Sequence, residues 1–168
     1  MTDSSQIKKN LLENIEFLQD FQLFLGNIFR INGALLATAE NVCKNDPVIT
    51  VPIWRILAVL RRQQMTVPAV ARYLGLKRQS VQTTVNQMIE KGLVKTENNP
   101  DHKKSYLVSM TQEGNKSLAR VNNYQKTLTE LFVDGFNTSI EELVKVTNFI
   151  RKLRENSLVN IESFNTKQ

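Results

Sequence analysis

The chain has 168 residues and a mass of 19.3 kDa, with 41% hydrophobic residues and a formal net charge of +6. This length and composition predict one globular domain, residues 1–168, and exclude a disordered or fibrous protein. No apolar run is long enough to span a membrane, and one cysteine with one histidine cannot form a disulfide or a zinc site, so we expect no membrane contact, no metal and no cofactor. The polar first ten residues are unlike a secretory signal, which favours a cytoplasmic protein.

The first third of the chain predicts a long amphipathic helix from Ile7 to about Val42. We expect a bend or break at Gly26, Asn32 and Gly33, which weaken the pattern. If it is continuous, the helix would reach about 50 Å, whereas a compact chain of this size is about 40 Å across. A second copy of the chain is therefore the expected cover for its apolar face. The apolar residues recur three or four positions apart: Ile7, Leu11, Ile15, Leu18, Phe21, Leu25 and Ile28.

Two prolines mark the starts of the next two helices, because the missing N–H of proline is harmless in a first turn. Pro52 precedes a predicted helix from Ile53 to about Arg62, and Pro68 opens a shorter helix that ends at Gly75. A third helix follows at once, from about residue 78 to residue 91, and a second glycine closes it.

Two strand-like stretches follow, Leu93–Glu97 and Ser105–Met110, with a polar, basic turn between them. The order of helix, short helix, tight turn, helix and basic hairpin predicts a winged helix-turn-helix over residues 46–111. Residues 50–111 contain ten basic and three acidic residues, whereas the rest of the chain contains twelve basic and thirteen acidic residues. The net positive charge is thus confined to this segment, where it suits a polyanion such as nucleic acid.

Helices are predicted again in the last third of the chain. Thr111 can cap a helix that runs to about Phe132, and Ser139 with Glu142 forms a capping box for a final helix with an apolar stripe. Residues 1–45 and 112–168 are therefore predicted to be helical flanks of the middle segment. The expected fold class is mainly α with a small β-wing, a winged helix-turn-helix flanked by N- and C-terminal helices.

The third helix of the middle segment has an inward stripe, Val81, Val85 and Met88, and a polar outward face. Glutamine and asparagine can form two hydrogen bonds to adenine, serine and threonine can bind a base edge or a phosphate, and arginine suits guanine or phosphate. Taken singly, these residues are also ordinary surface residues, and lysines on a hairpin add affinity more than discrimination. The predicted DNA-binding residues are Thr66, Arg78, Gln79, Ser80, Gln82, Thr83, Asn86, His102, Lys103 and Lys104.

Three segments together resemble the multiple-antibiotic-resistance regulator (MarR) family. They are TVPIWRILAVL from Thr50, AVARYLGLKRQSVQTTVNQMIEKGLV from Ala69, and NPDHKKSYLVSMTQEG from Asn99. The resemblance implies a homodimer on a palindromic operator, with release by a small aromatic ligand or by oxidation. It also implies that residues 1–45 and 112–168 are the helical dimerisation region, with N- and C-terminal dimerisation helices. This chain departs from the family pattern at Lys77, where a capping serine is frequent, and at the wing tip, where His102, Lys103 and Lys104 replace Asp-Arg-Arg.

The resemblance also implies an effector cleft, with Phe29, Trp54, Arg55 and Tyr73 near it, in which Arg55 would pair with an aromatic carboxylate or another anion. The alternative, which we favour, is that Trp54 belongs to the core and Arg55 contacts phosphate. Some relatives sense oxidants through a cysteine near the start of the first helix. Cys43 lies at the opposite end of that helix, which favours a structural role.

No catalytic motif is present, so we do not expect an enzyme. The predicted function is a sequence-specific, double-stranded DNA-binding transcription regulator, a homodimeric repressor whose affinity a small ligand modulates. The alternative is a winged-helix interaction module, an anti-regulator that acts through a protein partner. The basic middle segment favours DNA.

Overall fold

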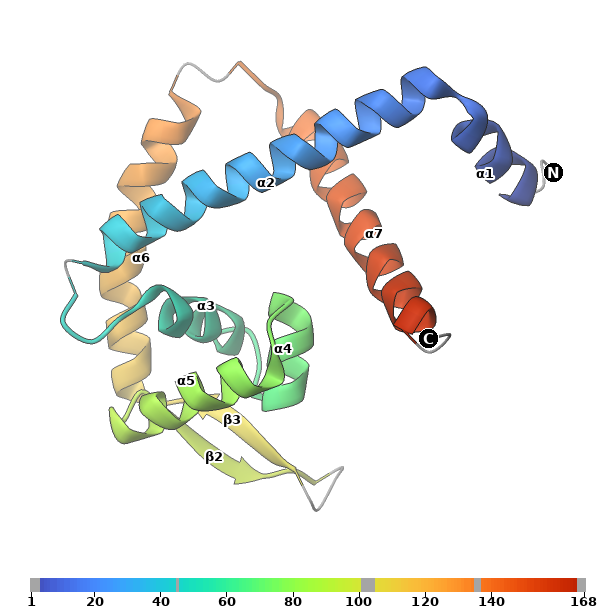
Figure 1. The fold of residues 1–168 in the computed structure, drawn as a ribbon. Coiled ribbons are helices and arrows are strands. Elements are labelled where there is room, and N and C mark those ends of the chain that lie inside the picture. The colour runs from blue at the N-terminus through green and yellow to red at the C-terminus, as the bar shows by residue number, and fades with distance from the viewer. Residues whose placement is uncertain (1–3, 45, 101–104, 135–136, 166–168) are drawn as a thin grey trace. The chain divides into compact units, whose positions relative to one another are not determined.

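The computed structural model describes residues 4–44, 46–100, 105–134 and 137–165 (Figure 1). The chain divides into two compact units, Met1–Lys126 and Thr127–Gln168. The elements are α1 (Ser4–Glu13), α2 (Ile15–Cys43), α3 (Val51–Leu60), β1 (Met65–Thr66), α4 (Val67–Leu74), α5 (Arg78–Glu90), β2 (Val94–Asn98), β3 (Tyr106–Met110), α6 (Gln112–Val133) and α7 (Ile140–Asn165). Helix α6 begins in the first unit and ends in the second.

The predicted break in the long N-terminal helix is wrong in its position. Helix α2 passes without interruption through Gly26 and Gly33, and the chain breaks instead at Asn14, between α1 and α2. Asn14 is extended, and its Oδ1 accepts the N–H of Phe17 at 2.9 Å. An interior glycine costs a helix only about 1 kcal/mol, which a 29-residue helix tolerates, whereas a capping asparagine stabilises a new start.

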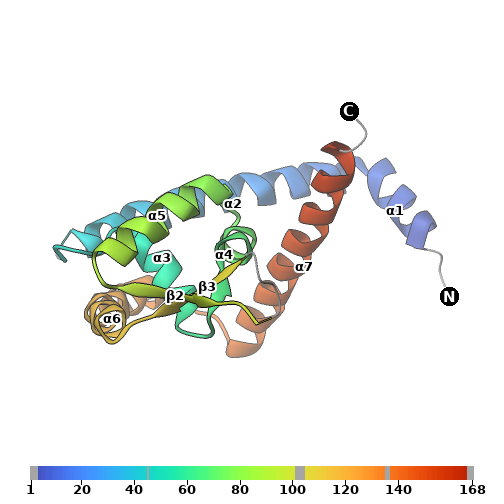
Figure 2. The ribbon, with the colours of Figure 1, turned by 90° about the horizontal axis from the view of Figure 1, so that it is seen from below.

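The core of the first unit lies among α3, α4, α5 and the sheet. Its largest fully buried side chains include Ile53, Ile56 and Leu57 of α3, Val70 of α4, Val81, Val85 and Met88 of α5, and Val108 of β3. The antiparallel sheet has the order β1-β3-β2, and α5 lies beside β2 (Figure 2). The two predicted strands are confirmed to within one residue. The sequence did not predict β1, because two residues are too few for a period-two pattern.

The turns between these helices have the predicted chemistry. Gly75 and Gly92 have φ values of 65° and 67°, in the left-handed region that favours glycine. Pro52 and Pro68 lie in the first turns of α3 and α4, and the hydroxyl of Thr66 accepts the N–H of Ala69. The prolines and Thr66 thus mark the starts of α3 and α4, and the glycines follow the ends of α4 and α5.

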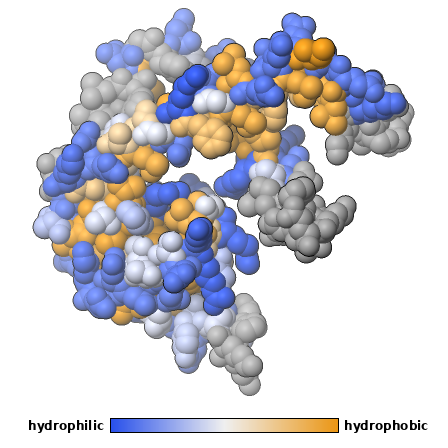
Figure 3. Space-filling view, in the orientation of Figure 1, coloured by the Kyte–Doolittle hydropathy of each residue, from blue (hydrophilic) through white to orange (hydrophobic). Residues whose placement is uncertain are grey.

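The flanking helices expose apolar side chains. In α2 only the last turns are buried, at Ala39, Val42 and Cys43, and apolar surface is visible along α1 and α2 in Figure 3. In α7, Ile140 is 84% exposed, and the predicted capping box is confirmed, since Ser139 and Glu142 exchange hydrogen bonds. None of the described helices is long and apolar enough to cross a membrane. The large exposed apolar side chains of these helices include Ile15, Leu23, Phe29, Leu35, Leu143, Val146 and Phe149.

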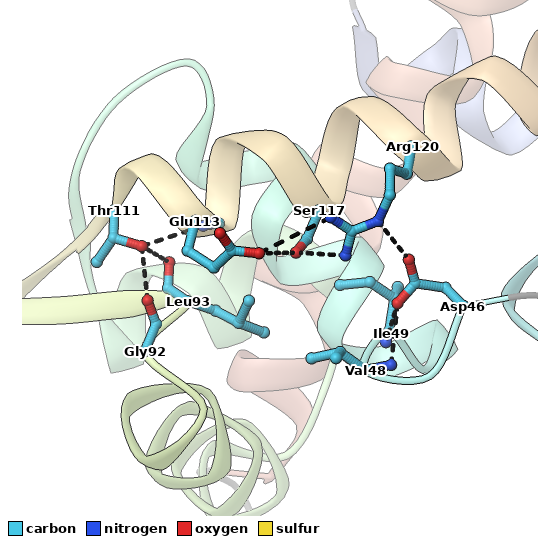
Figure 4. Close-up of polar contacts among 10 residues, drawn as sticks. Asp46, Val48, Ile49, Gly92, Leu93, Thr111, Glu113, Ser117 and Arg120 are labelled. Atoms are coloured by element: carbon cyan, nitrogen blue, oxygen red, sulfur yellow. Dashed lines mark hydrogen bonds and ion pairs between the residues drawn. The ribbon is translucent and has the colours of Figure 1, made fainter.

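A polar cluster joins the loop after α2 to helix α6 (Figure 4). The side chain of Asp46 is 3% exposed; it accepts the N–H groups of Val48 and Ile49 and the Nε of Arg120, which lies 2.9 Å away. Arg120 also donates to the hydroxyl of Ser117 at 3.0 Å. Burial alone would raise the pKa of Asp46, but the hydrogen bonds from the two N–H groups and from Arg120 outweigh burial and lower it. The carboxyl is therefore ionised at neutral pH and is satisfied by the protein.

Close by, Thr111 ties the start of α6 to the end of α5. Its hydroxyl accepts the N–H of Gly114 and lies 2.7 Å from the carbonyl oxygen of Gly92 and 3.0 Å from that of Leu93. The predicted cap of α6 is thus confirmed. A side chain at Gly114 would collide with the Leu93 carbonyl oxygen, so only glycine fits this approach.

Candidate nucleic-acid interface

Helix α5 has one buried face and one exposed face. Val81, Val85 and Met88 are each 1% exposed or less, which confirms the predicted inward stripe. The opposite residues, Gln79, Ser80, Gln82, Thr83 and Asn86, are all exposed, and so is Arg78 at the helix start. The buried stripe anchors the helix, and the exposed face carries groups that can bond to base edges or phosphates.

Several of these polar groups already have local partners. The Nε2 of Gln82 donates to the Oδ1 of Asn86 at 2.9 Å, one helical turn along. The hydroxyls of Thr83 and Thr84 donate to the carbonyl oxygens of Gln79 and Ser80. The exposed face is therefore a partly ordered set of donors and acceptors. Lys77, which departs from the family pattern, occupies the N-cap position of α5 without a side-chain capping bond.

A hollow of about 190 Å³ lies between the start of α5, the start of α4 and the sheet. It brings together three of the predicted DNA-binding residues, Thr66, Arg78 and Gln82. Thr96, Ser105 and Tyr106 also line it, and sequence reasoning missed all three. The signal available for Tyr106 was the alternation of its strand, which places it on the same face as Val108; Tyr106 is 62% exposed, whereas Val108 is buried.

The tip of the hairpin, with His102, Lys103 and Lys104, lies outside the described residues. At its base the Nδ2 of Asn99 donates to the hydroxyl of Ser105 at 2.8 Å. Lys95 of β2 pairs with Glu97 at 2.7 Å, and this hydrogen bond and charge lower the pKa of Glu97. The positive charge of Lys95 is therefore partly neutralised within the strand.

A second hollow, of about 280 Å³, lies between α3 and α4. Its lining includes Trp54, Arg55, Arg62 and Tyr73, so three of the four residues predicted to bind an effector come together here. Phe29 does not line this hollow; it lies on α2 and is 77% exposed. Arg55 donates to the carbonyl oxygen of Leu74, and the buried Nε1 of Trp54 has no hydrogen-bond partner among the described residues. That nitrogen is closed to solvent, so a ligand in the hollow does not reach it in this conformation.

Cys43 is buried near the end of α2. Burial raises the pKa of its thiol, and the charge of Asp46 raises it further. The reactive thiolate is therefore disfavoured, in keeping with a structural role.

Comparison with known proteins supplies the family. A model of the MarR family matches residues 49–105. Uncharacterised proteins of Mycobacterium bovis and Mycobacterium tuberculosis are 33% identical over 97 residues, which are 58% of this chain and 67% of theirs.

Solved structures of transcriptional regulators share the fold. BldR of Sulfolobus solfataricus has a TM-score of 0.73 at 16% identity, over 80% of this chain and 96% of that one. Staphylococcus aureus MarR, in complex with salicylate and kanamycin, has a TM-score of 0.68 at 20% identity, over 85% and 95%. Sco3205 of Streptomyces coelicolor, in complex with DNA, has a TM-score of 0.67 at 17% identity, over 80% and 86%. With its mainly α-helical winged helix-turn-helix, this chain belongs to the MarR family, whose members are DNA-binding transcription regulators.

Proposed function

We propose that the protein is a homodimeric repressor that binds a palindromic operator in double-stranded DNA. The observation that carries this proposal is helix α5, which is fixed by a buried apolar stripe and presents exposed amides and hydroxyls on its other side. In this proposal residues 46–111 are the DNA-binding lobe. Residues 1–45 and 112–168 hold two copies together and keep the two α5 helices about 34 Å apart, one turn of B-DNA.

The chemistry of each side chain determines which part of the DNA it is expected to contact. Gln82 and Asn86 face base edges, whereas Arg78, Thr66 and the hairpin lysines neutralise or bind phosphates. The exposed apolar residues of α2 and α7 support the dimer. Large exposed apolar surfaces are rare on monomeric proteins and mark surfaces that another molecule covers. Sedimentation is expected to give a mass near twice 19.3 kDa. A stable monomer would refute the dimer.

Binding to DNA is tested by fluorescence anisotropy, with the duplex upstream of the protein's own gene and a scrambled duplex. Neutralising six to ten phosphates reduces affinity by about 10³- to 10⁵-fold between 50 and 200 mM salt, so we expect steep salt dependence and preference for the native duplex. Arg78→Ala is expected to reduce the slope of log affinity against log salt concentration by about 1, the contribution of one phosphate contact. Lys145→Ala is the control for loss of a positive charge outside α5, in α7, where Lys145 pairs with Glu141, and sedimentation of this variant verifies that its mass is that of the wild type.

An interaction module that works through a protein partner would give a different result. Its binding to DNA would be weak and without sequence preference. Selection from random duplexes then distinguishes it from a regulator whose operator lies elsewhere, because only the regulator enriches a common site.

We also propose that an aromatic anion in the hollow between α3 and α4 weakens DNA binding. Arg62 supplies a second positive charge beside that of Arg55, and Trp54 supplies an aromatic part of the lining. Trp54 is the only tryptophan of the chain, so its fluorescence reports on this hollow alone. Salicylate, which Staphylococcus aureus MarR binds, is the probe. We expect it to change Trp54 emission saturably, and Arg62→Met to weaken the response; an unchanged spectrum at saturating salicylate would contradict this proposal for aromatic carboxylates.

A further inference from the structure

The hollow beside the start of α5 lies on the surface that the proposed function turns toward DNA. It is lined by the starts of α4 and α5 and by the sheet, which lies below these two helices in Figure 1. Arg78 and Gln82 belong both to this lining and to the exposed face of α5. Thr96 and Tyr106 line the hollow from the sheet, and both are exposed. The hollow therefore opens onto the same surface as the exposed residues of α5.

The alternation of the two long strands explains why Tyr106 reaches this hollow. Side chains two positions apart on a strand point to the same face of the sheet, and Val108 is buried on the face that packs against α3 and α4. Thr96 pairs directly with Val108, so it shares that face. Tyr106 continues the same row beyond the core, where it is 62% exposed. The sheet thus presents two hydroxyl-bearing side chains toward the helices.

The charge of the lining suits an anion. Arg78 supplies a positive charge, and none of the described residues that line the hollow is acidic. Glu97 follows Thr96 in the chain and therefore points to the other face of the sheet, where it pairs with Lys95. The hydroxyls of Thr96 and Tyr106 are neutral groups that can donate hydrogen bonds. A positive charge combined with neutral donors is the set with which proteins contact DNA phosphates.

A helix in the major groove lies between two sugar–phosphate backbones, which form the walls of a groove about 12 Å wide. The hollow lies at the start of α5, on the side of the helix that faces the sheet. The backbone on that side of the groove therefore passes over the hollow. Given the proposed binding to DNA, we propose that a backbone phosphate is bound in this hollow, where Arg78 pairs with its charge and the hydroxyl of Tyr106 donates a hydrogen bond to it.

A phosphate bound from two sides sets the position of α5 in the groove. Arg78 belongs to α5 and Tyr106 to β3, so one phosphate links the helix to the wing. Phosphate contacts fix the register of a protein on DNA but carry no sequence information. Tyr106 is thus a positioning residue, and its loss is expected to weaken binding to all duplexes alike. Gln82, which faces a base edge in the proposed function, is expected to affect preference instead.

The first test is Tyr106→Phe in the full-length protein, with fluorescence anisotropy on the duplex upstream of its own gene and on a scrambled duplex. The variant loses the hydroxyl but keeps the ring and the formal charge. Affinity for both duplexes is expected to fall about tenfold, the loss of one hydrogen bond to a charged group. The slope of log affinity against log salt concentration is expected to stay that of the wild type, whereas Arg78→Ala reduces it.

Ser109→Ala is the matched control for loss of a hydroxyl. Ser109 lies on the same strand, one residue after Val108, and therefore on the opposite face of the sheet. Its hydroxyl donates to Glu97 there. This variant is expected to bind both duplexes as the wild type does. The circular dichroism spectrum and the unfolding midpoint of each variant verify that the sheet and α5 remain folded.

The second test identifies the phosphate. A neutral methylphosphonate replaces one phosphate at a time in the native duplex, and affinity is measured for the wild type and for Tyr106→Phe. At one position beside the major groove, the methylphosphonate and Tyr106→Phe remove the same hydrogen bond. Their combined effect there is expected to be smaller than the product of their separate effects. At the other positions the two effects are expected to multiply.

The outcomes distinguish this inference from the proposed function. If Tyr106→Phe binds both duplexes as tightly as the wild type, or loses affinity only for the native duplex, Tyr106 does not bind a phosphate and the inference is refuted, while DNA binding by the wild type stands. Effects that multiply at every methylphosphonate position would refute it as well. If the wild type binds neither duplex even at about 50 mM salt, both the phosphate site and the proposed function are refuted.

Discussion

Removing the carboxylate of Asp46 is expected to destabilise the protein although the residue lies outside the candidate interface. Asp46→Ala leaves the N–H groups of Val48 and Ile49 without their acceptor, and the second of these hydrogen bonds is buried. A buried donor without a partner costs about 1–3 kcal/mol, and a hydrogen bond to a charged group contributes about 1.5–3 kcal/mol. Since the contacts overlap, we expect a loss of about 2–4 kcal/mol in the free energy of unfolding.

Asp46→Asn separates the two contributions. Its side-chain oxygen can still accept the N–H groups of Val48 and Ile49, but an NH₂ donor then faces the Nε–H of Arg120, so both the charge and the acceptor for Arg120 are gone. Because the side chain of Arg120 is 47% exposed and water can solvate it, this loss is expected to be smaller than that of Asp46→Ala. The hydrogen bonds to the N–H groups of Val48 and Ile49, and not the ion pair with Arg120, are therefore expected to account for most of the loss of unfolding free energy in Asp46→Ala.

The assay is urea unfolding followed by circular dichroism, at one protein concentration for all variants, because the stability of a dimer depends on concentration. Lys9→Ala is a suitable control, since its pair with Glu13 is exposed on both sides and is expected to contribute little. Equal losses for Asp46→Ala and Asp46→Asn, or a loss below about 0.5 kcal/mol for Asp46→Ala, would refute this account of the loop.

Three further predictions follow from the described contacts. Because the pKa of Asp46 is lowered in the folded state, its charge stabilises the fold above the ordinary pKa of about 3.9. This stabilisation is lost as the pH falls through the folded pKa, so the unfolding free energies of wild type and Asp46→Asn are expected to converge in acid. A difference that stays constant with pH would contradict this. Gly114→Ala is expected to cost about 1–3 kcal/mol of unfolding free energy through collision with the Leu93 carbonyl oxygen, and also to lower affinity for DNA. Gly75→Ala is expected to cost about 1–2 kcal/mol through its positive φ alone. Urea unfolding and anisotropy distinguish the two variants, and unchanged DNA affinity in Gly114→Ala would show that the contact between the start of α6 and the end of α5 does not position α5. Leu143→Glu is expected to shift the sedimenting mass toward 19.3 kDa, and an unchanged dimer would exclude this face of α7 from the interface.

Much of the winged helix-turn-helix was predictable because the residues that start and end its helices act locally. Prolines in first turns, glycines with positive φ and a threonine cap each act over three or four residues, so they can be read without knowing the fold. The exposed face of α5 was predictable for the same reason, since a buried stripe at helical spacing determines which residues point outward.

The features that were missed depend on contacts between distant segments. Strand β1 exists because Met65 and Thr66 pair with Val108 and Leu107, and Tyr106 reaches the hollow beside α5 only after the sheet has formed. The bond between Asp46 and Arg120 joins residues 74 positions apart. The predicted break differs from the observed one for a local reason. The capping side chain of Asn14 starts a new helix, whereas interior glycines do not interrupt a helix as long as α2.

The edge of the small sheet limits how copies of the protein can associate. Strand β2 lies at the outside of the order β1-β3-β2, and four of its five residues are exposed. An exposed edge is a template for pairing with another chain, and charged side chains discourage such pairing and the aggregation that follows from it. Lys95 and Glu97 place such charges on β2. These charges therefore disfavour pairing of the β2 edge with a strand of another molecule.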